Sequence, residues 1–421
     1  MSTNKVDQEG HGDSVLERLT ENEMKQMTVG PSISTITFLR FSENPTENIR
    51  DRLGAIVQAN PWLLGKLVKR EGKLYLKYCK KVDQFDLSNV FNPTNQKRKA
   101  AVIHSEMEYK ELCGKLGGSY AEIPRGAACI NKNEYLFAVS LLQDSKRPQD
   151  TVAMVFSLSH VISDGFTYYK LLAMMSSDAV IESLNPTRKH DIVQEGGEAI
   201  GSKESTWSKS GATMFNVVSG LLFGKKPLIE SYHVDPERIL KAKQEARDVK
   251  FVSTNDILCS TFGNAINARV LMVPLNFRGR LSKFNANDAG NYEGALVFCP
   301  DDYETPSLIR QTLESGTPVF KRKGDTPLPG CCEGMSCTLG MVTSWVFPFF
   351  SQVNIDGCEQ MMHLPHCDIS MVPFDIAVVY QPKAGQIAVT FFVRSTQSQG
   401  LKEHCPIGNL IPTPEQYCSS N

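Results

Sequence analysis

The sequence has no excess of charge of one sign and no long hydrophobic run. Its 421 residues include 45 Lys and Arg against 46 Asp and Glu, a formal net charge of -1. Without a global basic field, we expect no nucleic-acid partner. The longest apolar stretches, residues 212–224 and 342–350, are shorter than the ~20 residues of a membrane-spanning helix. We therefore expect no transmembrane segment.

Signals of export and of disorder are also scarce. The first thirty residues are polar and acidic, which does not fit a signal peptide. Twelve cysteines without such a signal favour reduced thiols. With 41% hydrophobic and 22% charged residues, the composition is that of a globular chain. We expect a soluble protein of the cytoplasm, and a monomer is favoured.

The predicted elements indicate a mixed α/β fold. Apolar, β-branched runs over residues 31–41 and 151–159 predict strands, the second one covered on both faces. The sequence Ser253-Thr254-Asn255-Asp256 is a capping box, which predicts that a helix begins there. Residues 376–380 and 387–393 flank a turn, and their pattern predicts a β-hairpin.

A polar segment divides the chain into two nearly equal halves. Residues 186–210 combine charged side chains with paired glycines, which is typical of a linker. We predict an N-terminal lobe over residues 1–190, a crossover linker over 191–230 and a C-terminal lobe over 231–421. Within the linker, the apolar residues 212–224 are consistent with either a packed helix or the rim of a binding tunnel.

The sharpest motif is Ser159-His160-Val161-Ile162-Ser163-Asp164-Gly165, which follows the predicted strand 151–159 and precedes a helical pattern. A histidine at a strand end is held by rigid backbone, and an imidazole with a pKa of ~6.5 accepts a proton near neutral pH. Asp164 is suited to the first turn of the next helix, and Gly165 permits a tight turn. The alternative is a buried core histidine beside an aspartate that only caps the helix.

The motif resembles the HxxxDG signature of the superfamily that contains chloramphenicol acetyltransferase, peptide-synthetase condensation domains and the BAHD acyltransferases. Further segments resemble landmarks of these enzymes, in the same order along the chain: residues 48–67, 252–258, Pro274-Leu275-Asn276-Phe277-Arg278-Gly279-Arg280-Leu281, 290–294 and Thr343-Ser344-Trp345. The resemblance implies an α/β fold of two chloramphenicol-acetyltransferase-like lobes, each a mixed β-sheet with helices, and a tunnel between them.

The resemblance also implies a role for each residue of the motifs. His160 is expected to be the general base, and Thr343 to donate a hydrogen bond to the oxyanion of the tetrahedral intermediate. Asp164 is expected to turn away from the tunnel and pair with Arg278, with Arg280 as the fallback partner, while Gly165 belongs to the same structural motif. Ser344 and Trp345 are expected to line the substrate tunnel.

One departure from the BAHD pattern concerns a structural segment. These enzymes usually carry Asp-Phe-Gly-Trp-Gly after the Ser-Trp motif, and here residues 353–358 hold only an Asp-Gly pair. The departure favours a divergent BAHD-like or a broader condensation-type enzyme.

Two other patterns each allow two interpretations. Cys358, His363, His366 and Cys367 form a C-x4-H-x2-H-C pattern in a segment that resembles a loop, but the spacing matches no usual zinc site, so no metal is expected. The basic run Lys321-Arg322-Lys323 is consistent with a solvated surface or with a contact to the phosphates of coenzyme A.

The sequence therefore predicts an acyltransferase that moves an acyl group directly from acyl-CoA to a small-molecule alcohol or amine. Coenzyme A thioester is then a co-substrate, and no prosthetic cofactor is required. Two alternatives stay open. The first is a condensation-type enzyme that uses an acyl carrier protein as donor. The second is a non-catalytic homologue that keeps the tunnel as a binding or assembly module.

Overall fold

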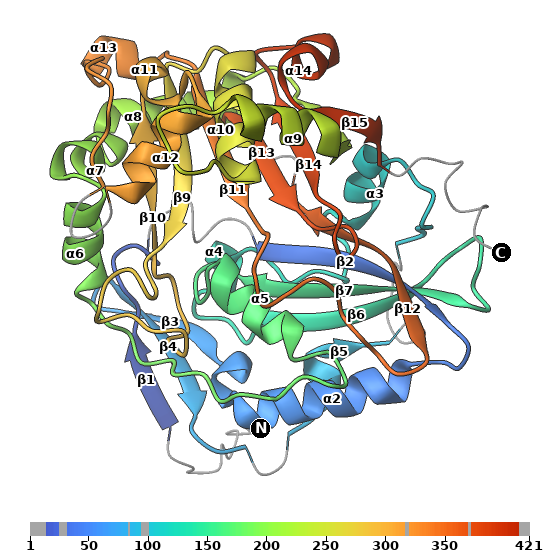
Figure 1. Cartoon of the computed structure of the whole chain (residues 1–421). Coiled ribbons are helices and arrows are strands. Elements are labelled where there is room, and N and C mark those ends of the chain that lie inside the picture. Colours follow the sequence, from blue (N-terminus) through green and yellow to red (C-terminus); the bar gives the residue numbers. More distant parts are fainter. Residues whose placement is uncertain are drawn as a thin grey trace.

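The computed structural model describes residues 14–24, 32–82, 85–93, 101–315, 320–368 and 372–411. These residues form three β-sheets of three, five and seven strands with helices packed around them (Figure 1). The predicted class, a mixed α/β fold, is confirmed. No helix of the described part is long and apolar enough to cross a membrane.

The five-stranded sheet is built mainly from the first half of the chain. Its strand order is β12-β2-β7-β6-β5. The bounds are β2 (Ser32–Phe41), β5 (Phe91–Asn92), β6 (Phe137–Gln143), β7 (Thr151–Ser159) and β12 (Cys358–His366). All nine residues of β7 are buried, as its continuous apolar run predicts.

Alternation along β2 places its side chains on two different cores. Ile33 and Leu39 pack with α2 (Thr46–Ala59) and α5 (Gly165–Ala173). Ile36 and Phe38 instead pack with α3 (Tyr109–Leu116) and with strands of the seven-stranded sheet. Because successive side chains of a strand point to opposite faces, this one strand joins the two halves of the molecule.

The seven-stranded sheet belongs to the second half. Its order is β10-β9-β11-β13-β14-β8-β15, with β11 parallel to both β9 and β13 and the other pairs antiparallel. The bounds are β8 (Leu228–Val234), β9 (Val270–Asn276), β10 (Glu293–Phe298), β11 (Leu339–Ser344), β13 (Asp375–Tyr380), β14 (Ala388–Val393) and β15 (Ile407–Leu410). The predicted hairpin is the antiparallel pair of β13 and β14.

Local signals account for the remaining elements. Ser253 and Asp256 form the predicted capping box of α10 (Thr254–Ala265), and Phe262 of that helix stacks on Phe391 of β14 at 5.6 Å. The small sheet, in the order β1-β4-β3, contains β1 (Ser14–Arg18), β3 (Lys66–Arg70) and β4 (Lys73–Cys79). The other helices are η1 (Pro61–Leu64), η2 (Leu87–Asn89), α4 (Gly126–Cys129), α9 (Pro236–Glu245), α11 (Pro300–Tyr303), α12 (Pro306–Glu314), α13 (Cys331–Gly334) and α14 (Ser398–His404).

The segment expected as a crossover linker is largely helical. It contains α6 (Ile192–Ala199), α7 (Ser202–Ser208) and α8 (Gly211–Phe223). Trp207 and Val217 pack on one face of the seven-stranded sheet, while α10 covers the other face. The polar composition of residues 186–210 concealed the first two of these helices, because only a few of their side chains are buried.

The prediction of a loop around residues 358–367 is wrong. Residues Cys358–His366 form β12, which pairs antiparallel with β2 at the edge of the five-stranded sheet. The second half of the chain therefore contributes a strand to the sheet of the first half. Pairing with β2 stabilises this strand through contacts remote in sequence, which local patterns do not report.

Candidate active site

The HxxxDG-like motif lies in the connection between a buried strand and a helix. β7 ends at Ser159, His160 follows, and Asp164 is the N-cap of α5. The Asp164 carboxylate accepts a hydrogen bond from the Thr167 amide at 2.9 Å, as an N-cap residue does. Rigid elements on both sides thus fix the backbone that carries His160.

A cavity of about 530 Å³ lies between the two halves of the molecule and contains this motif. Its wall includes six of the predicted site residues: His160, Asp164, Gly165, Thr343, Ser344 and Trp345. The seventh, Arg278, is 6% exposed and lies outside the lining. The basic run 321–323 is also outside the lining, and its Arg322 pairs with Asp302 at 2.7 Å.

His160 presents one of its two ring nitrogens to the cavity. Its side chain is 25% exposed. Nδ1 is buried, and no residue of the described part forms a hydrogen bond with it. The backbone carbonyl of His160 accepts a hydrogen bond from Nδ2 of Asn291 at 2.8 Å. Nε2 is therefore the nitrogen that a bound molecule can meet.

Glu293 is a cavity residue that the sequence analysis did not single out. Its Oε1 lies 3.7 Å from Nε2 of His160. Burial raises the pKa of Glu293; the charge of His160 opposes this rise, while that of Asp164 adds to it. Glu293 follows Asn291-Tyr292 in the segment 290–294, which carried part of the resemblance. The resemblance, however, assigned this glutamate no role.

Asp164 pairs with Arg278, the residue that the resemblance implied. Oδ2 of Asp164 lies 2.7 Å from Nη1 of Arg278, and each side chain is 1% exposed. The same oxygen accepts a hydrogen bond from the Tyr292 amide at 2.9 Å. Burial alone would raise the pKa of Asp164, but the Arg278 guanidinium outweighs burial and holds this pKa below its ordinary value. Arg280, the fallback partner, instead donates to the carbonyl of Asn276 at 3.1 Å.

Arg278 is also held by neutral acceptors. Its guanidinium donates to the carbonyls of Asp288 and Gly290 at 2.8 and 3.0 Å, and to Oγ1 of Thr167 at 3.0 Å. Thr167 lies on α5, whereas the two carbonyls precede β10. The arginine therefore links the helix that follows His160 to the strand that carries Glu293.

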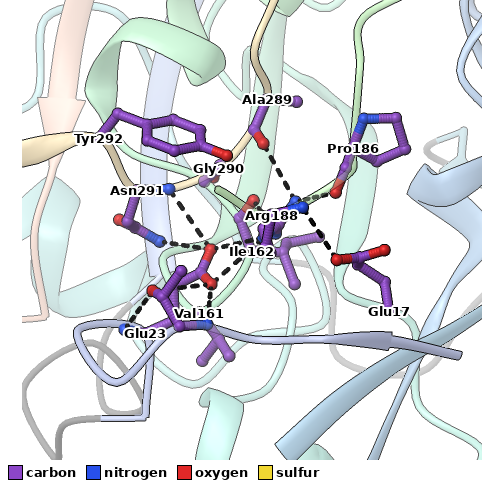
Figure 2. A network of polar contacts seen from close by, with 12 residues as sticks. Glu17, Glu23, Val161, Ile162, Pro186, Arg188, Ala289, Gly290, Asn291 and Tyr292 are labelled. Atoms are coloured by element: carbon purple, nitrogen blue, oxygen red, sulfur yellow. Dashed lines mark hydrogen bonds and ion pairs between the residues drawn. The ribbon is translucent and has the colours of Figure 1, made fainter. Parts of the chain in front are cut away.

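A second buried ion pair lies behind the motif and was not expected from the sequence (Figure 2). Nε of Arg188 lies 2.9 Å from Oε1 of Glu23, and both side chains are fully buried. Arg188 also donates to the carbonyl of Ile162, within the motif, at 3.0 Å. Oε1 of Glu23 accepts from the backbone amide of Asn291 at 3.3 Å. Because the Asn291 side chain holds the His160 carbonyl, this network supports the motif from its far side.

The Thr343-Ser344-Trp345 segment reaches the cavity from the end of β11. Thr343 and Ser344 close the strand in register with Val378 and Val379 of β13. The Trp345 amide continues the pairing by donating to the Val379 carbonyl at 2.7 Å. The Trp345 ring packs edge-on against Tyr169 of α5 at 6.2 Å. Strand β11 thus brings this segment to the same cavity as His160.

The histidines of the possible zinc pattern have other partners. His363 is buried, with Nδ1 2.9 Å from Thr37 Oγ1 and Nε2 3.2 Å from Tyr169 OH, and burial lowers its pKa to about 3. Nε2 of His366 lies 2.8 Å from the Glu122 carboxylate. Over the described residues, no group of three or more His, Cys, Asp or Glu side chains is placed to hold a metal ion.

Comparison with known proteins supports the fold at low sequence identity. No family model and no curated protein matches the chain. Among solved structures, F. graminearum TRI101 complexed with ethyl coenzyme A is 12% identical, with a TM-score of 0.61 over 93% of this chain and 96% of that one. Vinorine synthase is 13% identical, with a TM-score of 0.58 over 93% and 94%.

The first condensation domain of the CDA synthetase is 14% identical, with a TM-score of 0.55 over 92% of this chain and 93% of that one. The chain therefore shares its fold with TRI101, vinorine synthase and a condensation domain. The predicted fold class, two chloramphenicol-acetyltransferase-like lobes, is thereby confirmed.

Proposed function

We propose that this protein is an acyltransferase that moves an acyl group from coenzyme A to the hydroxyl or amine of a small molecule, with His160 as general base. The observation that carries the proposal is the position of His160. It lies at a strand end in a cavity formed by both halves, with its outer nitrogen beside Glu293. The shared fold with TRI101, which was crystallised with coenzyme A and T-2 mycotoxin, supports the choice of substrates.

The proposed reaction is a single direct transfer. The acceptor O–H or N–H gives its proton to Nε2 of His160 while its lone pair attacks the thioester carbonyl carbon. The carbonyl π pair moves to oxygen, and Thr343 donates a hydrogen bond to that oxyanion. The C–S bond then breaks, and the thiolate takes the proton from His160. Positioned proton transfer of this kind contributes about 10²–10⁴-fold to the rate.

Glu293 has a defined part in this proposal. When Nε2 accepts the proton, an imidazolium forms 3.7 Å from Oε1 of Glu293. An ionised carboxylate at that distance stabilises the positive ring by Coulomb attraction. In this proposal Glu293 therefore acts on the imidazolium and does not touch the thioester.

Asp164 and Arg278 have a structural part. Their buried pair fixes the backbone between β7 and α5, together with the Thr167 and Tyr292 amides. No proton needs to pass through Asp164 in the reaction above. Gly165 lies at the first position of α5 and on the cavity wall.

A carrier-protein donor is the second candidate function. The similarity to a condensation domain of the CDA synthetase favours it, and the chemistry at the thioester is the same. Initial rates with equal concentrations of acyl-CoA and of an acylated carrier protein separate the two donors. We expect faster transfer from acyl-CoA. Transfer from the carrier alone would replace coenzyme A in the proposal but keep His160 as base.

The general test measures products from a panel of acyl-CoAs mixed with a cell extract, followed by mass spectrometry. We expect a mass increase of one acyl group on an alcohol or amine, with release of free coenzyme A. The same extract with His160→Ala is the negative control. His190→Ala, at an exposed position, is the matched control and should form product normally. If no panel member gives a product that depends on His160, the cavity serves binding or assembly and the proposal fails.

A further inference from the structure

The polar side chains of helix α8 (Gly211–Phe223) form hydrogen bonds within the protein. Oγ1 of Thr213 donates to the Trp207 carbonyl at 2.9 Å. The Asn216 amide donates to the carbonyls of Gly334 and Cys337 at 3.0 and 2.9 Å. Ser219 donates to the Asn216 carbonyl at 2.9 Å. The hydrogen-bonding side chains of this helix are therefore satisfied by the protein, the reverse of a surface helix that presents polar groups to water.

The outward side of α8 is apolar and uncovered in this chain. In the described residues, its exposed large side chains are Met214 (41%), Phe215 (57%), Val218 (37%), Leu222 (69%) and Phe223 (85%). Positions 214, 215, 218 and 222 follow helical spacing, so they form one stripe. A contiguous apolar patch on a soluble surface usually marks an interaction site.

The apolar stripe has a lysine at one end and two at the other. Lys209 precedes α8, and Lys225 and Lys226 follow it; all three are exposed. Residues 205–229 contain no Asp or Glu. A basic and apolar surface of this kind complements an anionic lipid interface, where the apolar side chains enter the acyl boundary and the lysines meet the headgroups.

The helix is firmly attached to the molecule. At Gly220, α8 passes so close to the backbone of Pro373 that an added Cβ would lie 2.0 Å from its carbonyl oxygen. Val217 is buried against the seven-stranded sheet. In Figure 1, α8 lies at the upper left edge, near α7 and α13. A fixed helix can insert its outer side chains without unfolding.

The same helix forms part of the cavity wall. Met214, Val217, Val218 and Leu221 line the cavity that contains His160. Met214 and Val218 are thus both exposed and part of the lining. The exposed stripe and the cavity are continuous along this side of α8.

We propose that α8 docks the protein on an anionic lipid surface. Charge complementarity favours lipid over a second copy of this chain: two copies stacked through this stripe would bring lysines against lysines in either helix orientation. The docking itself is independent of catalysis. A second consequence rests on the proposed function. Docking at this helix indicates an apolar acyl donor or acceptor, which passes Met214 and Val218 on its way from the lipid into the cavity.

The test is co-flotation of the full chain with vesicles. Two compositions are compared: phosphatidylcholine alone, and phosphatidylcholine with 30 mol% phosphatidylserine, the fraction being roughly that of an anionic leaflet. The apolar variant is Phe215→Ser/Leu222→Ser/Phe223→Ser, and the charge variant is Lys225→Gln/Lys226→Gln. Val180→Ser/Leu240→Ser changes exposed apolar residues elsewhere, which are 79% and 56% exposed, and is the matched control.

We expect wild type and control to float with the anionic vesicles and to be released by salt. The apolar variant should bind at least tenfold more weakly, and the charge variant about fivefold more weakly for each lysine removed. Equal flotation of wild type and both variants, or no flotation of wild type, overturns the proposal. The proposal is also overturned if the wild type is a dimer and the apolar variant is a monomer. Binding to an acidic carrier protein in place of vesicles overturns it as well. Transfer of a water-soluble acyl group should be unchanged in both variants, so failure of docking and failure of the proposed function give different results.

Discussion

The substitution Asp164→Asn tests whether the motif aspartate is structural. The amide oxygen can keep the hydrogen bond to the Thr167 amide. The new NH₂ group, however, replaces the oxygen that accepts from Nη1 of Arg278 at 2.7 Å and from the Tyr292 amide at 2.9 Å. Three donors then face one another, and a guanidinium that is 1% exposed loses its counter-charge.

The magnitude follows from the burial of this pair. Removing one partner of a buried ion pair costs about 3–5 kcal/mol, because an uncompensated charge remains. An unfolding entropy of about 2.1 cal/mol/K per residue gives roughly 0.9 kcal/mol/K for the chain, if it unfolds in one transition. The expected fall in melting temperature is therefore about 3–6 °C.

The assay is thermal unfolding followed by circular dichroism. Activity is measured well below the transition. Asp191→Asn is the matched control, because Asp191 pairs with Lys283 at the surface, where their side chains are 61% and 54% exposed. Exposed pairs of this kind contribute little, so its melting temperature should be unchanged. In Asp164→Asn/Arg278→Met, which removes both charges, part of the loss should be recovered. If Asp164→Asn has the melting temperature of the wild type but is inactive, Asp164 has a direct chemical role and the structural reasoning is refuted.

Three further predictions concern the cavity and the core. Glu293→Gln removes the carboxyl group 3.7 Å from Nε2 of His160, so kcat should fall because the imidazolium formed in the reaction loses its neighbouring carboxylate. An unchanged kcat would show that Glu293 does not support the imidazolium. Thr343→Ala should lower kcat more than it raises the KM of the donor, and a change confined to KM would count against the oxyanion contact. Burial lowers the pKa of His363 from 6.5 to about 3, so its contribution to stability is complete above pH 6.5 and is lost as the pH falls from 6.5 toward 3. In His363→Gln, the free energy of unfolding measured by urea titration should fall less steeply with falling pH than in wild type, by up to about 1.36 kcal/mol per pH unit. Equal pH slopes in the two proteins would contradict a buried, neutral His363.

Elements specified by local sequence were predictable. The capping box at Ser253 begins α10 because both of its hydrogen bonds lie within four residues. Strand β7 was recognised because its run is nearly continuously apolar, and all nine of its residues are buried. In each case the residues that determine the structure are neighbours in sequence.

Elements specified by distant partners were missed. β12 joins β2 across more than 300 residues, and His363 faces Thr37 with a separation of 326. No local pattern distinguishes that strand from a loop. Within residues 191–230, α6 and α7 were concealed by their polar composition. A packed helix over residues 212–224 was one of two alternatives, but α8 exposes apolar side chains and bonds its polar ones to the protein, so its pattern does not show which side faces the protein.

The same division holds for the site. His160, Asp164 and Gly165 are contiguous enough to form a motif, and the resemblance supplied Arg278. Glu293 was missed because a glutamate is usually solvated, and only the fold places it beside His160. The pair of Glu23 and Arg188 was missed as well, since 165 residues separate them.

The most direct test of the central claim is the rate of thiol release by His160→Ala at saturating acceptor. A folded variant, with wild-type melting temperature, should release coenzyme A about 10²–10⁴-fold more slowly than wild type. An unchanged rate would show that His160 is not the base.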